Sequence, residues 1–507
     1  MPRYKPIDRN PRLLPVVLAE QIQPGTFEFA LDHLVDQELD LSALDAKFNN
    51  DETGASAYDP RIMLKIVLLA YSRGLVSSRS IERACLHNVQ FIALSGDSQP
   101  SYTHIAKFVR ELGEQIKPLF TQVLLTCDRL GLIGRQMFAI DGVKLPGNAS
   151  KERSGTHAEL LHRAARLEKA ADKIITLHQS QDGGAQEANL DEQRQARIDA
   201  LHREAQATRD FVARTAKRTN RQGQELKSNV TDPDSAKMAT SKGVIQGYAA
   251  QAAVDNAHQV IVAAQVTGSG SEQSMLLPMV RASQCVRAAH TLITADAGYH
   301  SNDNIAALQQ DSIPALIADK QMRQRDERFA QQAKHKAKAN PLYDKRLVRQ
   351  EAPIHLYRPS DFRHDPSTNS CICPAGQRLY SNGSHCTVNG REHHKFTGSK
   401  TSCVPCQHRS RCLRHPERTQ VRQVAMFAKH QAGPHAATQV MKQAIDSPRG
   451  RRLYSQRIAT VEPVFGNLRH NKRLGRFTLR GKAKVNTQWS LYCLVHNIEK
   501  LAHHGYH

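Results

Sequence analysis

The chain contains 507 residues, with 70 Lys and Arg against 48 Asp and Glu, for a formal net charge of +22. This length is too great for one ordinary core and predicts about two to four domains. The basic excess favours a polyanionic partner, because Lys and Arg displace the counterions condensed on phosphates. The sequence has no apolar run near the roughly 20 residues of a membrane-spanning helix and no apolar stretch after its charged start. We therefore expect a soluble, non-exported, cytoplasmic protein without a membrane partner.

Residues 1–130 are predicted to form a helical N-terminal domain. Ser77 precedes one helical pattern with the chemistry of a helix cap, and Pro100 precedes another. Short helices with basic outer faces suit a helix-turn-helix DNA reader, and a plain helical bundle fits the pattern equally well. The first apolar stripe at helical spacing consists of Leu64, Val67, Leu68, Tyr71 and Leu75.

Residues 155–225 carry two heptad-like apolar runs, at positions 160–174 and 198–212. Gly183 and Gly184 lie between the runs and break the helical pattern. Two helices joined in this way predict an antiparallel helical hairpin, inserted into the surrounding fold.

Around this hairpin the sequence alternates between strand and helix patterns, which predicts an α/β core. One strand leads to Asp141 and another, at 291–294, leads to Asp296. The other predicted elements are strands at 243–255 and 258–267 joined by a turn at Asp255–Asn256, a helix at 272–286, a helix at 302–310 and a strand at 313–318.

Asp141 and Asp296 each stand at the end of an apolar, strand-like run, and Glu462 lies in a helical pattern near the C-terminus. Water-driven cleavage of a phosphodiester needs an activated nucleophile and neutralised charge on the leaving oxygen, and divalent cations held by carboxylates supply both. The alternative is structural, since an Asp before Gly is common in turns and a Glu among arginines is common on solvated helices. Only the fold can bring residues so far apart in sequence together.

The helix of Glu462 also carries Tyr454, Arg457 and Arg469 at helical spacings, so these side chains are candidates to hold DNA phosphates. Pro463 directly follows Glu462 and cannot donate a backbone hydrogen bond, which predicts a kink or a new helix start at that point.

These motifs together resemble the transposases of bacterial insertion sequences that carry an Asp-Asp-Glu triad, in particular the insertion sequence 1182-like group of the wider insertion sequence 4/5 type. Segment 58–85 is similar to the helical N-terminal domain of that family, and Asp141-Gly-Val-Lys and Thr294-Ala-Asp-Ala-Gly-Tyr-His-Ser to its first two catalytic strands. The third element is met by Tyr454, Arg457 and Glu462. Arg469 stands where a lysine is usual, and one extra residue separates Arg457 from Glu462.

The resemblance implies a ribonuclease-H-like core, built from 131–154, 226–320 and the C-terminal segment 441–507. It implies Mg²⁺ or Mn²⁺ at Asp141, Asp296 and Glu462, hydrolysis at the ends of the element, and attack of the freed 3′-hydroxyl on target DNA. The partners would be double-stranded DNA, namely terminal inverted repeats and target. Cutting two ends in concert would suit a homodimer.

Six of the ten cysteines fall between Cys371 and Cys412, within a basic and cysteine-bearing insertion at 321–440. Such clustering in a non-exported chain favours metal over disulfides, and a structural Zn²⁺ site needs four ligands. An unmetallated reduced cluster and a redox pair are the alternatives. The candidate zinc ligands are Cys371, Cys373, Cys403, Cys406 and Cys412, with Cys386 and His408 in reserve. The scattered Cys85, Cys127, Cys285 and Cys493 are expected in the core.

Three other functions fit part of the sequence. A metal-dependent, structure-specific nuclease of the same fold would cut without joining strands. A DNA-binding protein that has lost catalysis would keep the basic charge without needing its carboxylates. A zinc-binding interaction module would account for the cysteines but not for the carboxylates.

Overall fold

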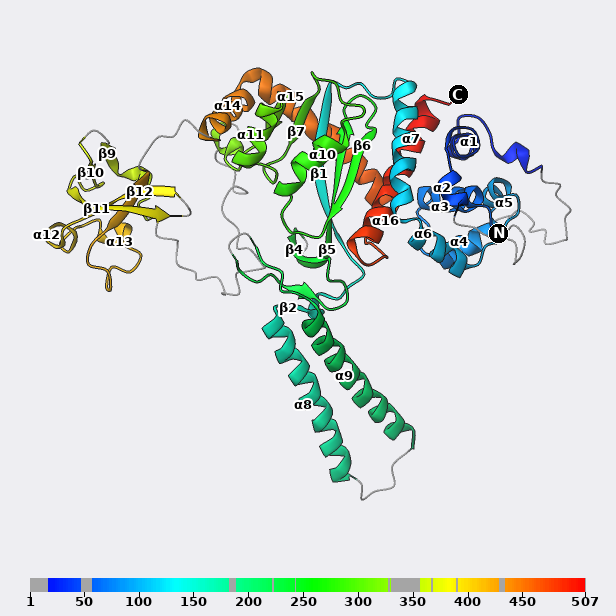
Figure 1. Ribbon diagram of the computed structural model, residues 1–507, viewed down its shortest axis with the longest axis horizontal. Helices are drawn as coiled ribbons and strands as arrows, with labels where there is room; N and C mark the ends of the chain where they lie inside the picture. The colour runs from blue at the N-terminus through cyan, green and yellow to red at the C-terminus, as the bar shows by residue number, and fades with distance from the viewer. Residues whose placement is uncertain are drawn as a thin grey trace, which may run out of the picture. The chain divides into compact units, whose positions relative to one another are not determined.

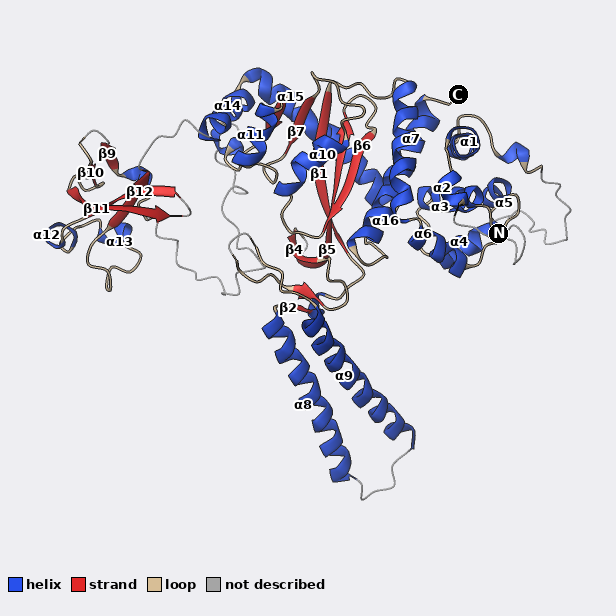
Figure 2. Ribbon diagram, in the orientation of Figure 1, coloured by secondary structure: helices blue, strands red, loops and turns tan. Residues whose placement is uncertain are grey.

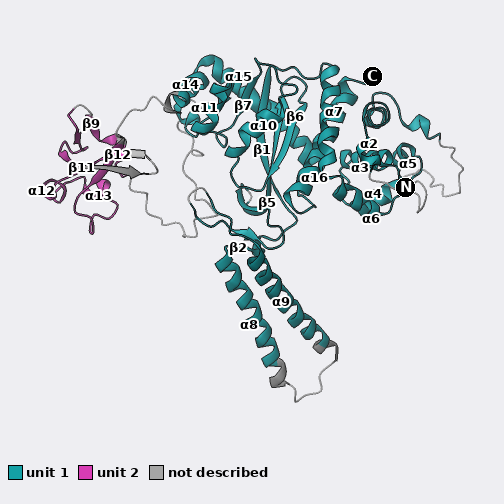
Figure 3. Ribbon diagram, in the orientation of Figure 1, with its two compact units in different colours: residues 1–343, 437–507 teal, residues 344–436 magenta. Residues whose placement is uncertain are grey.

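The structure is a computed structural model that describes residues 17–46, 57–181, 188–220, 223–241, 243–326, 329, 356–365, 368–388, 391–427 and 434–506. The chain divides into two compact units (Figure 3). Unit 1 combines Met1–Tyr343 with Ala437–His507, and unit 2 is Asp344–Ala436.

The N-terminal part of unit 1 is helical, as the sequence predicts (Figure 1). Ser77 and Ser101 accept hydrogen bonds from the backbone N–H groups of Ser80 and His104, so each caps a helix at a predicted start. Lys65 is buried, and its ammonium lies 2.6 Å from both Asp32 and Asp36. The helices are α1 (Phe27–His33), α2 (Ser42–Asp45), α3 (Pro60–Ser72), α4 (Ser78–His87), α5 (Val89–Ser95), α6 (Tyr102–Glu111) and α7 (Ile116–Arg129).

A six-stranded mixed sheet forms the centre of unit 1, which makes the chain a mixed α/β protein (Figure 2). Its order is β4-β5-β1-β7-β8, with β6 pairing on β5; β1 is antiparallel to β5 and parallel to β7. The strands are β1 (Met137–Pro146), β4 (Ala236–Thr240), β5 (Gly243–Asp255), β6 (Ile261–Thr267), β7 (Leu292–Ala295) and β8 (Ala315–Ile317). The predicted strands of the α/β pattern are thus present, with ends shifted by a few residues.

The helix α16 packs against β6 with polar as well as apolar side chains. The Asn497 side chain accepts from the Ile261 N–H at 2.8 Å and donates to the Ile261 carbonyl at 2.9 Å, and Asn486 accepts from Val266. These amides satisfy backbone groups of β6 that have no neighbouring strand. Outside the sheet-bearing part of unit 2, the helices after β6 are α10 (Leu276–Ala282), α11 (Asn302–Gln310), α14 (Pro434–Asp446), α15 (Pro448–Gly466) and α16 (Lys482–His504). None of the described helices is both long and apolar enough to cross a bilayer.

Two long helices, α8 (His157–Gln181) and α9 (Ala188–Arg214), pack side by side where the heptad-like runs predict them (Figure 1). Ala171, Ile198 and Leu201 are buried along their contact. The short strands β2 (Ser154–Gly155) and β3 (Ser228–Asn229) pair and close the base of the hairpin. The glycines at 183 and 184 lie outside the described residues.

Unit 2 is a small antiparallel sheet of order β13-β12-β11-β10-β9 with two short helices. Most of the predicted basic linker before it lies outside the described residues. The elements are β9 (Arg363–Asp365), β10 (Ser370–Ile372), β11 (Arg378–Val388), β12 (Arg391–Thr397), α12 (Lys400–Cys403), α13 (Arg409–Cys412) and β13 (Gln423–Phe427).

Two expectations need correction. The helix predicted over 272–286 is a 3₁₀ turn, Gln273–Met275, followed by the short α10, which ends at Ala282. Cys285 therefore lies beyond the helix and is exposed, although it was expected in the core. The other three scattered cysteines are buried, as expected. Those three are Cys85, Cys127 and Cys493.

Candidate active site

Asp141 and Asp296 lie side by side at the centre of the sheet. In the parallel pairing of β1 with β7, Ile140 is the register partner of Ala295, and each aspartate is the next residue of its chain. Each carboxylate also accepts a nearby backbone N–H at 2.8 Å, Asp141 from Gly142 and Asp296 from Gly298. Residues 155 positions apart in sequence are therefore neighbours because two parallel strands pair.

Arg457 of α15 reaches this pair from the covering helix. Its guanidinium lies 3.0 Å from the Asp141 carboxylate and 5.7 Å from the centre of the Tyr454 ring. Arg457 is 9% exposed, and its Nε lacks a hydrogen-bond partner. A buried guanidinium with an unsatisfied N–H, next to two carboxylates, can accept a further anionic group such as a phosphate.

Burial is the largest influence on the charge of Asp141. Burial raises the pKa of Asp141, and neighbouring Asp296 raises it further, while the positive charge of Arg457 acts in the opposite direction. The pKa of Tyr454 is raised mainly by burial, with Arg457 opposing and the two aspartates adding to the rise. Carboxylates crowded together out of water favour a bound cation, which would relieve both the repulsion and the cost of desolvation.

A third carboxylate, Glu272, lies at the same place and was missed by the sequence analysis. A Cβ built on Gly298 would stand 2.8 Å from the Glu272 Oε2 and 3.0 Å from the Asp296 Oδ1, so the two carboxylate oxygens flank one glycine. Burial raises the pKa of Glu272 to about 7; Lys144 opposes this rise, and Asp296 and Asp141 add to it.

The segment that carries Glu272 is fastened to the Asp296 loop. The Asn304 side-chain amide donates to the carbonyls of Gln273 (2.7 Å) and Tyr299 (2.8 Å), and the Gln273 side chain donates to the His300 carbonyl at 3.1 Å. In the sequence, Glu272 is a polar residue in a Gly- and Ser-rich stretch at a predicted helix start. That is an ordinary place for an acidic residue, so no local signal singles it out.

Glu462 and Arg469, by contrast, are exposed. Glu462 is five residues from Arg457, which is roughly 140° around a helix. It therefore lies well away from the stripe of α15 that faces the sheet, whose buried members are Gly450, Arg457, Thr460, Val461 and Val464. The fold brings Asp141, Asp296, Arg457 and Tyr454 together and leaves Glu462 and Arg469 on the outer side of the segment.

Pro463 lies inside α15, which continues to Gly466 without a new start. Proline has no N–H to donate to the carbonyl four residues earlier, that of Ala459. The Gln259 side chain donates to this carbonyl instead, at 3.2 Å. The helix then passes into one π-helical turn, Asn467–Asn471, which includes Arg469. No new helix start occurs at Pro463, and the Gln259 side chain supplies the donor that the proline lacks.

The donor chemistry of the site fits a hard divalent cation. Asp141, Asp296 and Glu272 offer carboxylate oxygens, the ligands that Mg²⁺ and Mn²⁺ favour, and Mg²⁺ keeps several waters rather than requiring a full protein cage. Within the described part of the chain no three His, Cys, Asp or Glu side chains stand at the spacing of a ready-made metal site.

Two protein-family models match the chain. The first, described as a transposase DDE domain, matches residues 372–502, and the second, described as a transposase domain (DUF772), matches residues 16–111. Over these two segments the chain is similar to transposase domains. The insertion sequence 1182-like subgroup stays a prediction, because neither match distinguishes subgroups.

The DDE match covers Glu462 and the cysteines from Cys373 onward, whereas Asp141 and Asp296 lie before the matched residues. The DUF772 match covers α1 to α6. No curated protein matches the chain.

Proposed function

We propose that the protein is an insertion-sequence DNA transposase that hydrolyses phosphodiester bonds at the element's ends and transfers the freed 3′-hydroxyl ends to target DNA. Its core would be ribonuclease-H-like, with the α8–α9 hairpin and unit 2 as insertions. The observation that carries the proposal is the pairing of Asp141 with Asp296 on adjacent parallel strands in a chain that matches two transposase families.

In this proposal Asp141 and Asp296 hold the divalent cation. When bound, Mg²⁺ or Mn²⁺ supplies an activated nucleophile and neutralises charge that develops on the phosphate. Arg457 would pair with a phosphate oxygen, because its guanidinium lies beside the carboxylates and is only partly satisfied. Tyr454 stacks under that guanidinium and limits its motion.

Two carboxylates are candidates for the third acidic residue of the site, beside Asp141 and Asp296. The sequence motif favours Glu462, which is exposed on α15. The geometry proposes Glu272, whose oxygen flanks the same glycine as that of Asp296. For Glu462 to join the pair, α15 would have to rotate or change register, and the π-helical turn that follows it is a natural place for such a change.

DNA recognition is proposed for the N-terminal helices. Arg79 of α4 stacks on Tyr102 of α6, with its guanidinium 5.1 Å from the ring centre, so a basic group is held where these helices meet. Arg469 would hold a phosphate from the outer side of the α15 segment. A homodimer would place two such sites on the two ends of one element.

The decisive experiment is cleavage of duplexes that carry the flanking element's ends, with Mg²⁺ or Mn²⁺, by wild-type protein and by Asp141→Asn and Asp296→Asn. We expect end-specific nicking that both variants lose by at least about 1,000-fold while they still bind DNA. Asp303→Asn, at the exposed start of α11, is the matched control and should cut normally. If wild type binds and never cuts, or if both active-site variants cut as well as wild type, the proposal fails.

The rival structure-specific nuclease is tested in the same reaction. Joined products in which an element end is linked to target DNA identify a transposase. The nuclease is identified if branched or hybrid substrates are cleaved without any joined product and if this cleavage requires the same two aspartates.

A further inference from the structure

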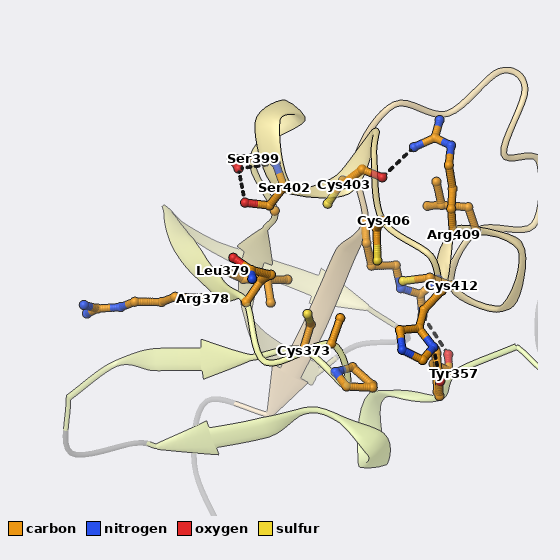
Figure 4. A pocket seen from close by; sticks show the side chains of 17 residues that line it. Tyr357, Cys373, Arg378, Leu379, Ser399, Ser402, Cys403, Cys406, Arg409 and Cys412 are labelled. Carbon is orange, nitrogen blue, oxygen red and sulfur yellow. Dashed lines mark hydrogen bonds between the residues drawn. The ribbon is translucent and has the colours of Figure 1, made fainter.

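Four of the five cysteines that the sequence groups as zinc ligands line one pocket in unit 2. Their side chains point into the same space between the turn after β10 and the α12–α13 segment (Figure 4). They are Cys373, Cys403, Cys406 and Cys412.

The fifth cysteine of that set, Cys371, is not part of this pocket. It lies within β10, is fully buried, and packs in the unit 2 core with Phe362 and Phe396. Cys373 is two residues later, but β10 ends at Ile372, so Cys373 lies in the turn. The side chain of Cys386 lies outside the described residues.

The turn at Cys373 is shaped by a glycine. Cys373 donates its N–H to Gln377 and accepts the Gly376 N–H at 2.8 Å. Gly376 has φ +76°, which side-chain-bearing residues rarely adopt. The turn places the half-buried Cys373 at the edge of the pocket.

Cys403 and Cys406 have the two-residue gap that lets both sulfurs reach one ion. Gly398 makes room for the first of them, since a Cβ there would stand 2.6 Å from the Cys403 sulfur. Arg409 N–H donates to the Cys406 carbonyl at 3.1 Å, which ties Cys406 to the start of α13, the helix that ends at Cys412.

The Arg409 side chain holds the rest of this segment. Its guanidinium donates to four backbone carbonyls, those of Cys403 (2.9 Å), Gln420 (3.0 Å), Pro416 (2.6 Å) and Thr419 (2.7 Å). One cation thus joins the Cys403 turn to the chain that leads into β13. Hydrogen bonds thus hold the segment that carries Cys403 and Cys406, while Cys373 and Cys412 also pack against the apolar cluster of unit 2.

Unit 2 has little core to hold it together. Among the described residues of unit 2, the buried cluster contains five, Phe362, Cys371, Leu379, Phe396 and Val424, with Tyr357, Cys373, Cys412 and Met426 packed against them. Small β units with so little apolar burial usually depend on disulfides or a bound metal. All nine described cysteines are free thiols, including the four in the pocket. Four reduced thiols that line one pocket can cross-link the unit by binding a metal ion, whereas disulfides would require their oxidation.

We propose that Cys373, Cys403, Cys406 and Cys412 bind one structural Zn²⁺ as a tetrahedral four-thiolate site. The described side chains do not stand at ligand spacing as they are, so binding would have to bring the four sulfurs closer together, and it would release their protons. The site stabilises unit 2 and takes no part in DNA cleavage. Its existence is independent of the proposed transposase activity.

The test is metal analysis of the full-length protein purified without chelator or added metal. We expect about one zinc per chain by plasma mass spectrometry, and loss of most of that zinc in Cys403→Ser, Cys406→Ser and Cys412→Ser. Cys285→Ser, an exposed lone cysteine, is the matched control and should retain the metal. Wild type without zinc, iron in place of zinc, or full zinc retention in the three pocket variants would overturn the site.

Variants that fail to fold would also lose metal, so a second measurement on the wild-type protein is needed. Co²⁺ exchanged into the site should give thiolate charge-transfer bands, and X-ray absorption should report four sulfur neighbours at about 2.3 Å. Nitrogen or oxygen in the first shell would contradict a four-cysteine site. Intact mass under non-reducing conditions showing paired cysteines would assign them to disulfides instead.

Discussion

At the scale of single residues, the central question is which carboxylate joins Asp141 and Asp296. The Asn304 amide ties the segment that carries Glu272 to the loop after Asp296, whereas Glu462 is exposed on α15. We expect Glu272→Gln to reduce cleavage of element ends at least about 10-fold, because it removes a negative charge that a cation at the aspartates would feel. Single-turnover cleavage at varied Mg²⁺ is the measurement.

The same assay on Glu462→Gln separates the two candidates. Loss of cleavage in both variants would mean that α15 rearranges to complete the site. Loss in Glu462→Gln alone, with Glu272→Gln unaffected at every Mg²⁺ concentration, would refute the role assigned to Glu272. Glu417→Gln, an exposed acidic residue of unit 2, serves as the control.

His496 supplies a residue-scale prediction about pH. It is buried in α16, where its Nε2–H donates to the Gln259 carbonyl and its Nδ1 accepts from the Asn467 amide. Burial lowers its pKa to about 3, the Gln259 hydrogen bond opposes this, and Lys500 and Lys472 lower it further. The unfolded chain takes up a proton near pH 6.5 and the folded chain does not, so stability is lost as pH falls from about 6.5 towards about 3.

Replacing His496 by Gln should remove this pH dependence. We expect wild type to lose about 2 kcal/mol more than the variant between pH 7.5 and pH 5. Urea unfolding followed by fluorescence checks this, because the chain's single tryptophan, Trp489, is buried in the same helix. Equal losses in both proteins would show that His496 takes up its proton at the same pH in the folded and unfolded chains.

At the scale of elements, the α8–α9 hairpin should behave as a separate cooperative segment. Its contact consists of a few buried aliphatic side chains and ion pairs such as Arg209–Glu168 (2.7 Å), and its base is closed by the β2–β3 pair. Ala171→Asp would bury a charge in that contact, at a cost of several kcal/mol. We expect faster hydrogen exchange throughout α8 and α9, with β1 and β5 unchanged.

Ala196→Asp is the matched control, because Ala196 is exposed on α9 and its replacement should leave exchange as in wild type. Faster exchange in β1 or β5 of the Ala171 variant would show that the hairpin and the sheet unfold together.

At the scale of the whole molecule, the net charge of +22 predicts how DNA binding responds to salt. Each phosphate contact releases counterions, so log affinity should fall linearly with log salt concentration. We expect non-specific duplex binding to weaken at least about 100-fold between 50 and 200 mM NaCl. Fluorescence anisotropy with a labelled random duplex measures this, and a nearly flat dependence would show that the basic residues are not at the DNA.

Local patterns were enough to predict much of the fold. The serine caps at Ser77 and Ser101 mark real helix starts, and the strand-like runs before Asp141 and Asp296 are β1 and β7. Cap chemistry and hydrophobic period act within a few residues, so they can be read without knowing the fold. The length of α10 and the exposure of Cys285 were misjudged, because a helix end without a proline or glycine leaves little local trace.

The sequence by itself determined the residue types, the basic charge and the two strand-end aspartates that point to a metal-dependent DNA enzyme. Only the tertiary structure decided which groups meet. It set Asp141 beside Asp296 through a parallel strand pair, brought Glu272 to them and Arg457 over them, and turned Glu462 outward on α15. It also separated Cys371, which packs in a core, from the four cysteines that share a pocket. The reason is physical: strand pairing and helix rotation are fixed by burial and hydrogen bonds across the whole chain, and no short stretch of sequence records them.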